Sequence, residues 1–190
     1  MLKHIRPALV SLALFTALLG IAYPLAIAGV GRALFPDQAT GSPIMRDGKV
    51  IGSRLIGQQF TRPDYFWGRP SAAGKGYDAR ASAGSNLGPS SQALADRIAV
   101  EAERYGQPAG EIPPDLLTAS ASGLDPHISP AAARFQVSRV ATARGIPIDA
   151  ITKLVDDHVE TPSLGFLGEP RVNVLELNLA LDALSRTWPQ

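Results

Sequence analysis

Two short segments of this 190-residue chain combine carboxylates with an imidazole, the residue types used in acid–base catalysis and metal binding. In Asp125-Pro126-His127 the proline restricts the geometry, and Asp-Pro is a common turn starter, so we predict a structural turn rather than a site. The segment Asp156-Asp157-His158-Val159-Glu160 resembles a metal cluster. Adjacent helical positions point in different directions and cannot converge on one ion, so we predict a solvated helix end.

Two glycine-rich segments, Gly74-Lys75-Gly76 and Gly84-Ser85-Asn86-Leu87-Gly88, have backbone donors of the kind that cradle phosphate. Neither is followed at the right spacing by Lys-Ser or Lys-Thr, and neither lies clearly between a strand and a helix. We therefore interpret both as loops. A serine hydrolase is disfavoured too, because the chain has no Gly-x-Ser-x-Gly elbow and only His4, His127 and His158 as bases.

Composition narrows the class of protein further. The formal net charge is only +1 and the charged residues are interspersed, so we expect no nucleic acid partner. The absence of cysteine excludes disulfides and thiolate metal sites. The 18 glycines and 16 prolines indicate long ordered loops or a surface covered by other protein.

The sequence predicts paired strands first, then a long irregular loop, and then several helices that would position these residues. A β-branched run over 49–58, after the turn pair Asp47-Gly48, predicts a hairpin or paired strands. Segment 61–89 has many glycines and prolines and little periodicity, so we predict a long irregular loop. Start and stop signals then predict helices from Ser90 or Ser91 to Gly106, from Ser129 to Gly145, from Asp149 to His158, and from a capping box at Asn173-Val174-Leu175-Glu176. Strands followed by several helices favour an α+β fold.

An uncharged run over 7–31 separates Lys3 and Arg6 from Arg32. At about 1.5 Å per residue, its roughly 25 residues make a helix of about 37 Å, enough to span a hydrocarbon core of about 30 Å. We therefore predict one N-terminal transmembrane helix.

The excess of positive charge before this run predicts its orientation. We expect a cytoplasmic start over 1–6, a linker over 32–44, and a single mixed extracytoplasmic domain over 45–190. The chain would then be a single-pass protein of the cell (inner) membrane, with membrane lipid around its helix.

Ala26-Ile27-Ala28 keeps a second interpretation open, because a signal peptidase accepts small residues at this spacing. Cleavage after Ala28 would release a secreted extracytoplasmic enzyme or binding protein. Against cleavage, the apolar run is longer than the about 7 to 15 residues of a typical signal core, and it continues through Val30.

Small residues spaced four apart in the run let another membrane helix approach closely. The pairs are Ala13 and Ala17, Thr16 and Gly20, and Ala22 and Ala26. Such pairs also arise by chance, so partner packing and lipid-facing filler both stay open. We expect Pro24 to kink the helix, because proline lacks a backbone donor.

Several longer segments form a pattern that is more specific than any single motif. They are Gly52-Ser53-Arg54-Leu55-Ile56-Gly57-Gln58 with Phe60, Pro63-Asp64-Tyr65-Phe66, Arg69-Pro70-Ser71-Ala72, the glycine-rich 84–88, the serine-rich 118–129 continuing to Gln136 and Arg139-Val140-Ala141, and 164–175. In this combination the chain resembles, nearly end to end, the C subunit of the Kdp potassium-transporting P-type ATPase.

The resemblance implies a non-catalytic accessory subunit of a high-affinity, ATP-driven potassium uptake complex. Its partners would be a channel-like potassium-binding subunit, an ATP-hydrolysing pump subunit and a very small membrane peptide. It implies support for assembly and a raised ATP affinity of the pump subunit, with ATP reached only through the complex and no cofactor bound firmly by this chain. We expect partner contacts in 61–89 and 118–129.

The resemblance also implies a candidate nucleotide contact at Gln136, and no catalytic or metal-binding residue. The charge bias places Gln136 outside the cell, whereas ATP is inside. We therefore prefer a helix-packing role for Gln136.

Overall fold

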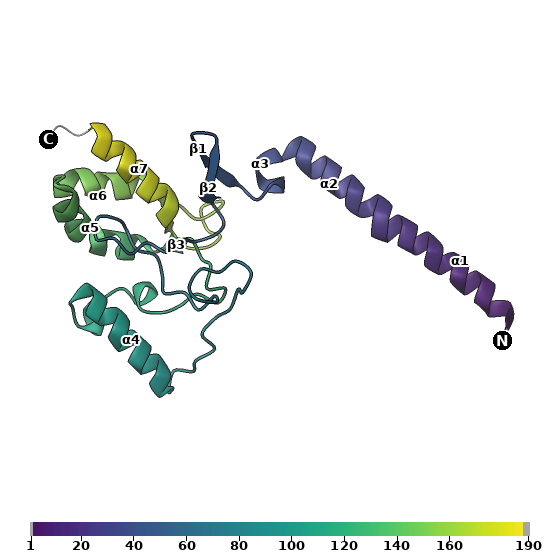
Figure 1. The fold of residues 1–190 in the computed structure, drawn as a ribbon, viewed down its shortest axis with the longest axis horizontal. Helices are drawn as coiled ribbons and strands as arrows, with labels where there is room; N and C mark the ends of the chain where they lie inside the picture. The colour runs from purple at the N-terminus through teal and green to yellow at the C-terminus, as the bar shows by residue number, and fades with distance from the viewer. Residues whose placement is uncertain (1, 188–190) are drawn as a thin grey trace. The chain divides into compact units, whose positions relative to one another are not determined.

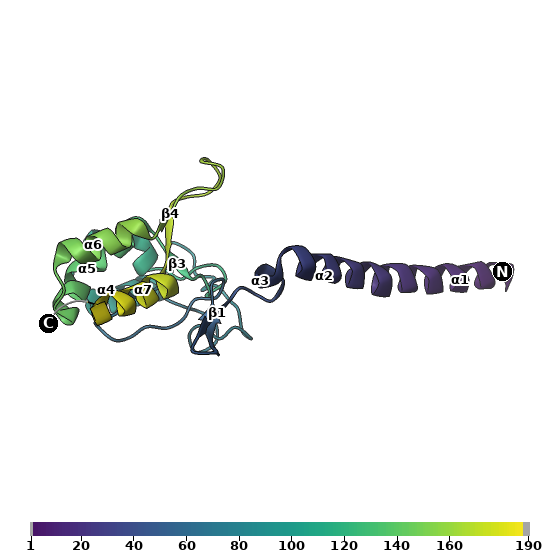
Figure 2. The same cartoon turned by 90° about the horizontal axis from the view of Figure 1, so that it is seen from above.

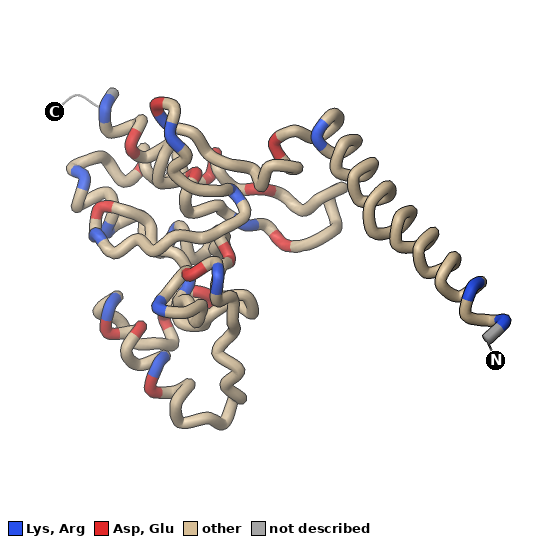
Figure 3. Tube along the Cα trace, turned by 45° about the vertical axis from the view of Figure 1, so that its right-hand side comes forward, with Lys and Arg blue, Asp and Glu red and all other residues tan. Residues whose placement is uncertain are grey.

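The structure, a computed structural model, describes residues 2–187, and the chain divides after Ile51 into two units that are described separately. Most of the first unit is an apolar helix, Ile5–Leu34, which is preceded by a 3-10 turn, η1 (Leu2–His4). None of its residues is buried, and it is long and apolar enough to cross a membrane. Figure 3 shows the helix without charge between its basic ends. The bounds of the cytoplasmic start, the transmembrane helix, the linker and the extracytoplasmic domain remain predictions.

The helix widens just before Pro24. It consists of α1 (Ile5–Phe15), a π-helical stretch η2 (Thr16–Ala22) and α2 (Tyr23–Leu34). The N–H of Tyr23 donates to the carbonyl of Leu18, five residues back. A π-helical turn is one way in which a helix accommodates a proline, and here the helix continues past Pro24 to Leu34.

A short helix and a hairpin complete the first unit. Their bounds are α3 (Pro36–Ala39), β1 (Pro43–Arg46) and β2 (Lys49–Ser53), whose last two residues lie in the second unit. Asp47 and Gly48 have φ angles of 51° and 74°, which suit a two-residue turn between right-handed twisted strands. The predicted hairpin is confirmed, although β2 ends at Ser53 rather than continuing to Gln58.

The second unit is α+β, as predicted. Its larger helices are α4 (Gln92–Tyr105), α5 (Pro130–Arg144), α6 (Ile148–Asp157) and α7 (Val174–Thr187), with 3-10 turns η3 (Ala109–Glu111) and η4 (Pro114–Leu116). Figure 1 shows α5, α6 and α7 grouped together. Segment 61–89 contains neither helix nor strand, which confirms the predicted loop.

A small antiparallel sheet lies against these helices, in the order β3 (His127–Ile128), β5 (Arg171–Asn173) and β4 (Val159–Glu160). Ile128 and Val159 both pair with Val172 of the central strand. The sequence analysis did not predict these strands, because two or three residues are too few to show alternation. They are interleaved with the helices along the chain.

Most of the predicted helix signals act as expected, but Ser91, the N-cap residue of α4, makes no side-chain capping hydrogen bond. Gly106 and Gly145 end α4 and α5 in the left-handed conformation, and the Ser129 hydroxyl accepts from the Ala132 N–H at 3.0 Å. The Asn173 side chain caps α7 by accepting from the N–H groups of residues 175 and 176, at 3.1 and 3.2 Å. The Glu176 carboxylate of the predicted capping box instead pairs with Arg54 at 2.5 Å.

The core forms where the apolar faces of α5, α6 and α7 meet the sheet and the loop. Its fully buried side chains include Phe66, Leu116, Val140, Ile151, Val155, Val172, Leu177 and Leu181. Phe66 belongs to the irregular segment 61–89, so the first part of this segment contributes to the core, whereas residues 79–83 are exposed. Side-chain hydrogen bonds hold the backbone of that first part in place.

Candidate functional site

The backbone of the loop is held from two helices by buried side-chain amides. Gln136 on α5 accepts from the Trp67 N–H at 2.8 Å and donates to the Trp67 carbonyl at 3.0 Å. Asn178 on α7 does the same for Phe66, at 2.9 and 3.0 Å. These bonds satisfy both backbone groups of two consecutive buried residues without a neighbouring strand.

The Trp67 side chain also has several close contacts. The guanidinium carbons of Arg104 and Arg139 lie 4.0 and 3.7 Å from its ring centroid. Its indole N–H donates to the Arg62 carbonyl at 2.8 Å. Stacked cations are attracted by the face of the ring, and Trp is the aromatic side chain that binds them best.

Two arginines of α5 bind carbonyls just before Phe66. Arg139 donates to Pro63 and Tyr65 at 2.5 and 3.0 Å, and Arg144 donates to Asp64 at 2.8 Å. Burial lowers the pKa of Arg139 to about 10, so it remains a cation at neutral pH. Arg104 donates to the Phe60 carbonyl at 2.9 Å. We call the side chains that hold segment 60–67 the clamp: Arg104, Gln136, Arg139, Arg144 and Asn178.

Two loops that are distant in the sequence pack on each other next to the clamp; we call segments 68–84 and 118–127 the double loop. The Ser71 hydroxyl donates to the Gly123 carbonyl at 2.6 Å, and the Ala83 N–H donates to the Ser122 carbonyl at 3.0 Å. Gly123 has a φ of +66°, and a Cβ there would lie 2.5 Å from the Ala83 oxygen. Only glycine fits this position without a backbone shift.

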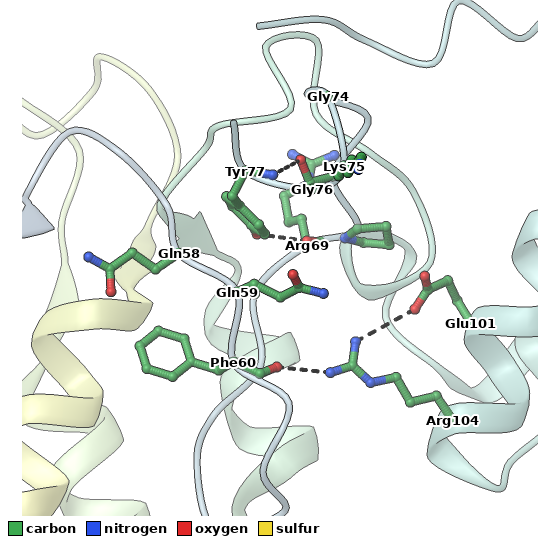
Figure 4. A pocket seen from close by; sticks show the side chains of 13 residues that line it. Gln58, Gln59, Phe60, Arg69, Gly74, Lys75, Gly76, Tyr77, Glu101 and Arg104 are labelled. Atoms are coloured by element: carbon green, nitrogen blue, oxygen red, sulfur yellow. Dashed lines mark hydrogen bonds and ion pairs between the residues drawn. The ribbon is translucent and has the colours of Figure 1, made fainter. Parts of the chain in front are cut away.

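A cavity of about 360 Å³ lies between segments 58–60 and 68–77 and helix α4 (Figure 4). Its lining is Gln58, Gln59, Phe60, Gly68, Arg69, Pro70, Ser71, Gly74, Lys75, Gly76, Tyr77, Glu101 and Arg104. Three of these side chains are basic and one is acidic, and Arg104 lies 3.8 Å from Glu101. Gly74-Lys75-Gly76 therefore forms part of a polar cavity wall, within a loop as predicted.

The two hydroxyl groups that line this cavity, those of Ser71 and Tyr77, form hydrogen bonds within the protein. Tyr77 donates to the Arg69 carbonyl at 2.7 Å, and burial raises the pKa of this phenol to about 12, with the Asp125 charge adding to the shift. Ser71 donates to Gly123 and accepts from the Tyr77 N–H at 2.8 Å. At neutral pH the phenol keeps its proton, and neither group is arranged as a nucleophile beside a base.

The structure assigns no backbone turn to the Asp125-Pro126-His127 segment, which was predicted to be a turn; it is irregular at Asp125 and Pro126 and enters β3 at His127. The carboxylate of Asp125 accepts from the His127 N–H at 3.0 Å, lies 3.3 Å from Nδ1 of the same residue, and lies 3.4 Å from Arg69. Burial alone would raise the pKa of Asp125, but the hydrogen bonds and charge of His127, together with Arg69, lower it below the ordinary value of 3.8. The carboxylate therefore joins Arg69 of segment 68–84 to the start of β3.

The acidic side chains at the end of α6 and in β4 do not converge on one point. The groups there have separate partners: Asp156 with Arg134 at 2.8 Å, Asp157 with Lys153 at 3.0 Å, Glu160 with Arg171 at 2.9 Å, and the His158 ring with the Leu154 carbonyl at 2.8 Å. Within residues 2–187 the structure shows no group of three His, Asp or Glu side chains that could hold a metal ion.

The sequence suggested a role for Gln136 alone among the clamp residues, and Arg139 entered only as part of the family pattern. Gln136 is 1% exposed, and its amide is used by Trp67, by the Ala132 carbonyl and by Arg139. One signal for Asn178 was available, since it is a polar residue flanked by the apolar face of the last helix. No comparable signal pointed to the stacking on Trp67.

Comparison with known proteins relates this architecture to a family. The pattern of the KdpC family, described as the c chain of the K+-transporting ATPase, matches residues 5–183. The chain belongs to the KdpC family. A potassium-transporting ATPase KdpC subunit of Caulobacter vibrioides is 61% identical over 96% of this chain and 94% of that protein.

Other KdpC subunits are similar over the same extent. The KdpC subunit of Polaromonas naphthalenivorans is 58% identical over 95% of this chain and 94% of its own length. That of Gemmatimonas aurantiaca is 58% identical over 100% of this chain and 97% of its own length. The KdpC match begins at the first residue of α1 and ends within α7, so it includes both units and confirms the resemblance.

Proposed function

We propose that this chain is a non-catalytic accessory subunit of an ATP-driven potassium uptake complex, and that it supports assembly and stability of the complex. The observation that carries the proposal is the KdpC match over residues 5–183, because the similar proteins are named as subunits of a potassium-transporting ATPase. The partners are a channel-like potassium-binding subunit, an ATP-hydrolysing pump subunit and a small membrane peptide.

In this proposal the helix Ile5–Leu34 stays attached as a single anchor in the inner membrane, and the second unit is extracytoplasmic. Lys3 and Arg6 precede the apolar run, which supports a cytoplasmic amino side. A Cβ built on Gly20 would lie 3.9 Å from the Thr16 methyl group, so these two small residues share one face of the helix. That face, with the other small-residue pairs, packs against a partner helix.

Hydrolysis of ATP belongs to a partner subunit, and the influence on ATP affinity implied by the resemblance is indirect. The amide of Gln136 already holds both backbone groups of Trp67, which supports a structural role over contact with a nucleotide. Instead of a nucleotide contact by Gln136, the clamp and the double loop pack together and contact a partner through 61–89 and 118–129. These packed segments cover the potassium entrance of the channel-like subunit.

Purification of the complex tests this function. With an affinity tag on the pump subunit, we expect the chain to be retained in mild detergent at a constant ratio to the other subunits. Its absence from the purified pump would contradict the proposal.

An intact-mass measurement separates the anchored subunit from the alternative of a released enzyme or binding protein. We expect a species that contains the whole helix, whereas a chain beginning after Ala28 would establish release.

A further inference from the structure

A cavity of about 400 Å³ lies beside Arg139 and is lined by α5, by the end of α4 and by Pro63. We propose that this cavity binds a small aromatic carboxylate, which supplies the negative charge that Arg139 lacks among the described residues. The inference concerns the second unit alone and goes beyond the proposed function, which it does not require. It also differs from the nucleotide contact implied for Gln136, because the ligand has a single charge and an apolar body.

Arg139 is a half-buried cation without an acidic partner. Among the described residues it forms no ion pair, and Asp64, whose charge acts on it, pairs with Arg62 at 2.6 Å. A second cation, Arg104, stacks on the same Trp67 ring and repels it. The oxygens and the ring around Arg139 carry only partial charges, and burying a cation is costly when no full opposite charge is near. An anion in the cavity would offset this cost.

The guanidinium of Arg139 also has N–H groups that nothing uses. Of its five N–H groups, two on Nη1 donate to the Pro63 and Tyr65 carbonyls and one on Nη2 donates to the Gln136 side chain. Its Nε is the one buried side-chain nitrogen or oxygen without a hydrogen-bond partner in the part of the chain that the structure describes. Buried polar atoms are nearly always paired, so this atom indicates an acceptor from outside the chain.

The walls of the cavity favour a ligand with an aromatic body and one charge. Helices α4 and α5, both labelled in Figure 2, meet there at Tyr105 and Phe135, whose ring centroids lie 5.7 Å apart. Arg139 is the one charged side chain among the nine described residues that line the cavity. A polyphosphate carries several charges and would need more cations than this. The volume is at the lower end of the range for small-molecule sites, about 300 to 1,000 Å³.

Tyr105 adds a neutral donor to the same cavity. Burial raises the pKa of this phenol to about 12, so the phenol keeps its proton at neutral pH. The described residues contact its ring, through Trp67 at 5.4 Å and Phe135 at 5.7 Å, but form no hydrogen bond with its hydroxyl. A half-buried tyrosine hydroxyl usually has a partner, and a carboxylate accepts from both a phenol and a guanidinium.

Titration calorimetry on the full chain in detergent tests the inference. The probe is phenylacetate, and phenylacetamide is its uncharged counterpart. We expect phenylacetate to bind with a Kd of about 1 mM or lower, as is usual for so small a ligand, and phenylacetamide to bind at least tenfold more weakly. Absence of phenylacetate binding, or equal binding of the two probes, would overturn the inference.

A cavity-filling variant locates the site. Ala143 lines the cavity from α5 and lies outside the clamp, so A143F should fill the cavity and leave the unfolding temperature unchanged. The matched control is A131F, at an exposed alanine of the same helix that does not line the cavity. We expect A143F to weaken phenylacetate binding at least tenfold and A131F to leave it unchanged. Wild-type affinity in A143F would overturn the site, and displacement of phenylacetate by ATP would identify a nucleotide site instead.

Discussion

At the residue scale, Gln136 and Asn178 form the backbone hydrogen bonds that a neighbouring strand forms in a β-sheet. Each amide donates to and accepts from the backbone of one residue, Trp67 or Phe66. A carboxylate at either position would lack the donor, and a lysine would lack the acceptor. The side-chain type is therefore set by the irregular backbone that it serves.

Replacing Gln136 by leucine tests this role. The change leaves a buried N–H and a buried carbonyl of Trp67 without partners, and we expect a loss of about 2 to 4 kcal/mol in the free energy of unfolding. Thermal unfolding of the full chain in detergent measures it. Q107L is the matched control, because Gln107 is exposed and its replacement should change stability by less than about 0.5 kcal/mol.

The same variant separates a structural role from a nucleotide contact. In the assembled complex, Q136L that is retained on the pump should leave the ATP dependence of hydrolysis unchanged. A rise in the ATP concentration needed for half-maximal activity, with retention and unfolding temperature intact, would instead establish a direct contribution from this side chain.

The lowered pKa of Asp125 predicts an acid-sensitive contribution to stability. Because the folded pKa lies below 3.8, the charged carboxylate stabilises the fold above about pH 4, and this stabilisation is lost as the pH falls through the folded pKa. We expect D125N to unfold at a lower temperature than the wild type at pH 7, with the difference shrinking below about pH 4. E103Q, at an exposed position of α4, should show no such pH-dependent difference.

At the scale of elements, the double loop depends on backbone contacts that no regular structure supplies. Segments 68–84 and 118–127 approach so closely at Gly123 that a Cβ there would lie 2.5 Å from the Ala83 oxygen and 2.7 Å from the Ala73 nitrogen. The approach joins the two regions in which we expect partner contacts. The two segments of the candidate contact surface are thus packed on each other.

Two glycine substitutions separate this contact from backbone conformation alone. Gly123 and Gly145 have nearly equal φ angles, +66° and +65°, but a Cβ on Gly145 meets nothing within 4 Å. We expect G145A to cost about 1 kcal/mol, the penalty of a left-handed alanine, and G123A to cost about 3 kcal/mol or more. Chemical denaturation of the full chain in detergent compares them, and equal losses would show that the close approach contributes nothing.

At the scale of the whole molecule, the chain combines an apolar helix with a folded unit whose core does not depend on that helix. The core side chains come from segments after residue 52, and no residue of the helix is buried. Such a helix must find its contacts in lipid or in other proteins. This arrangement is what an anchored subunit requires.

Single-cysteine labelling tests the proposed topology cleanly, because the natural chain has no cysteine. A membrane-impermeant maleimide applied to intact spheroplasts should label V100C and leave K3C unlabelled until the membrane is broken. The reverse pattern would contradict an extracytoplasmic second unit, and labelling of both positions would contradict a spanning helix.

The sequence by itself determined the elements whose signals are local. Ser129 and Gly145 bound α5, Asp47-Gly48 turns the hairpin, and the uncharged run forms one long helix, because caps, turns and apolar runs act within a few neighbouring residues. The KdpC pattern was also visible in the sequence, since it consists of contiguous segments. Each of these signals can be evaluated without knowing which distant residue lies nearby.

Only the tertiary structure decided how the loop is held and where the short sheet forms. Trp67 and Gln136 are 69 residues apart, and Phe66 and Asn178 are 112 residues apart. Strands β3 and β5 are joined by only two residue pairs, His127 with Asn173 and Ile128 with Val172. These contacts leave almost no local signal in the sequence. Each amide, arginine or two-residue strand needs a partner from a distant segment, and only the folded chain brings that partner within hydrogen-bonding distance.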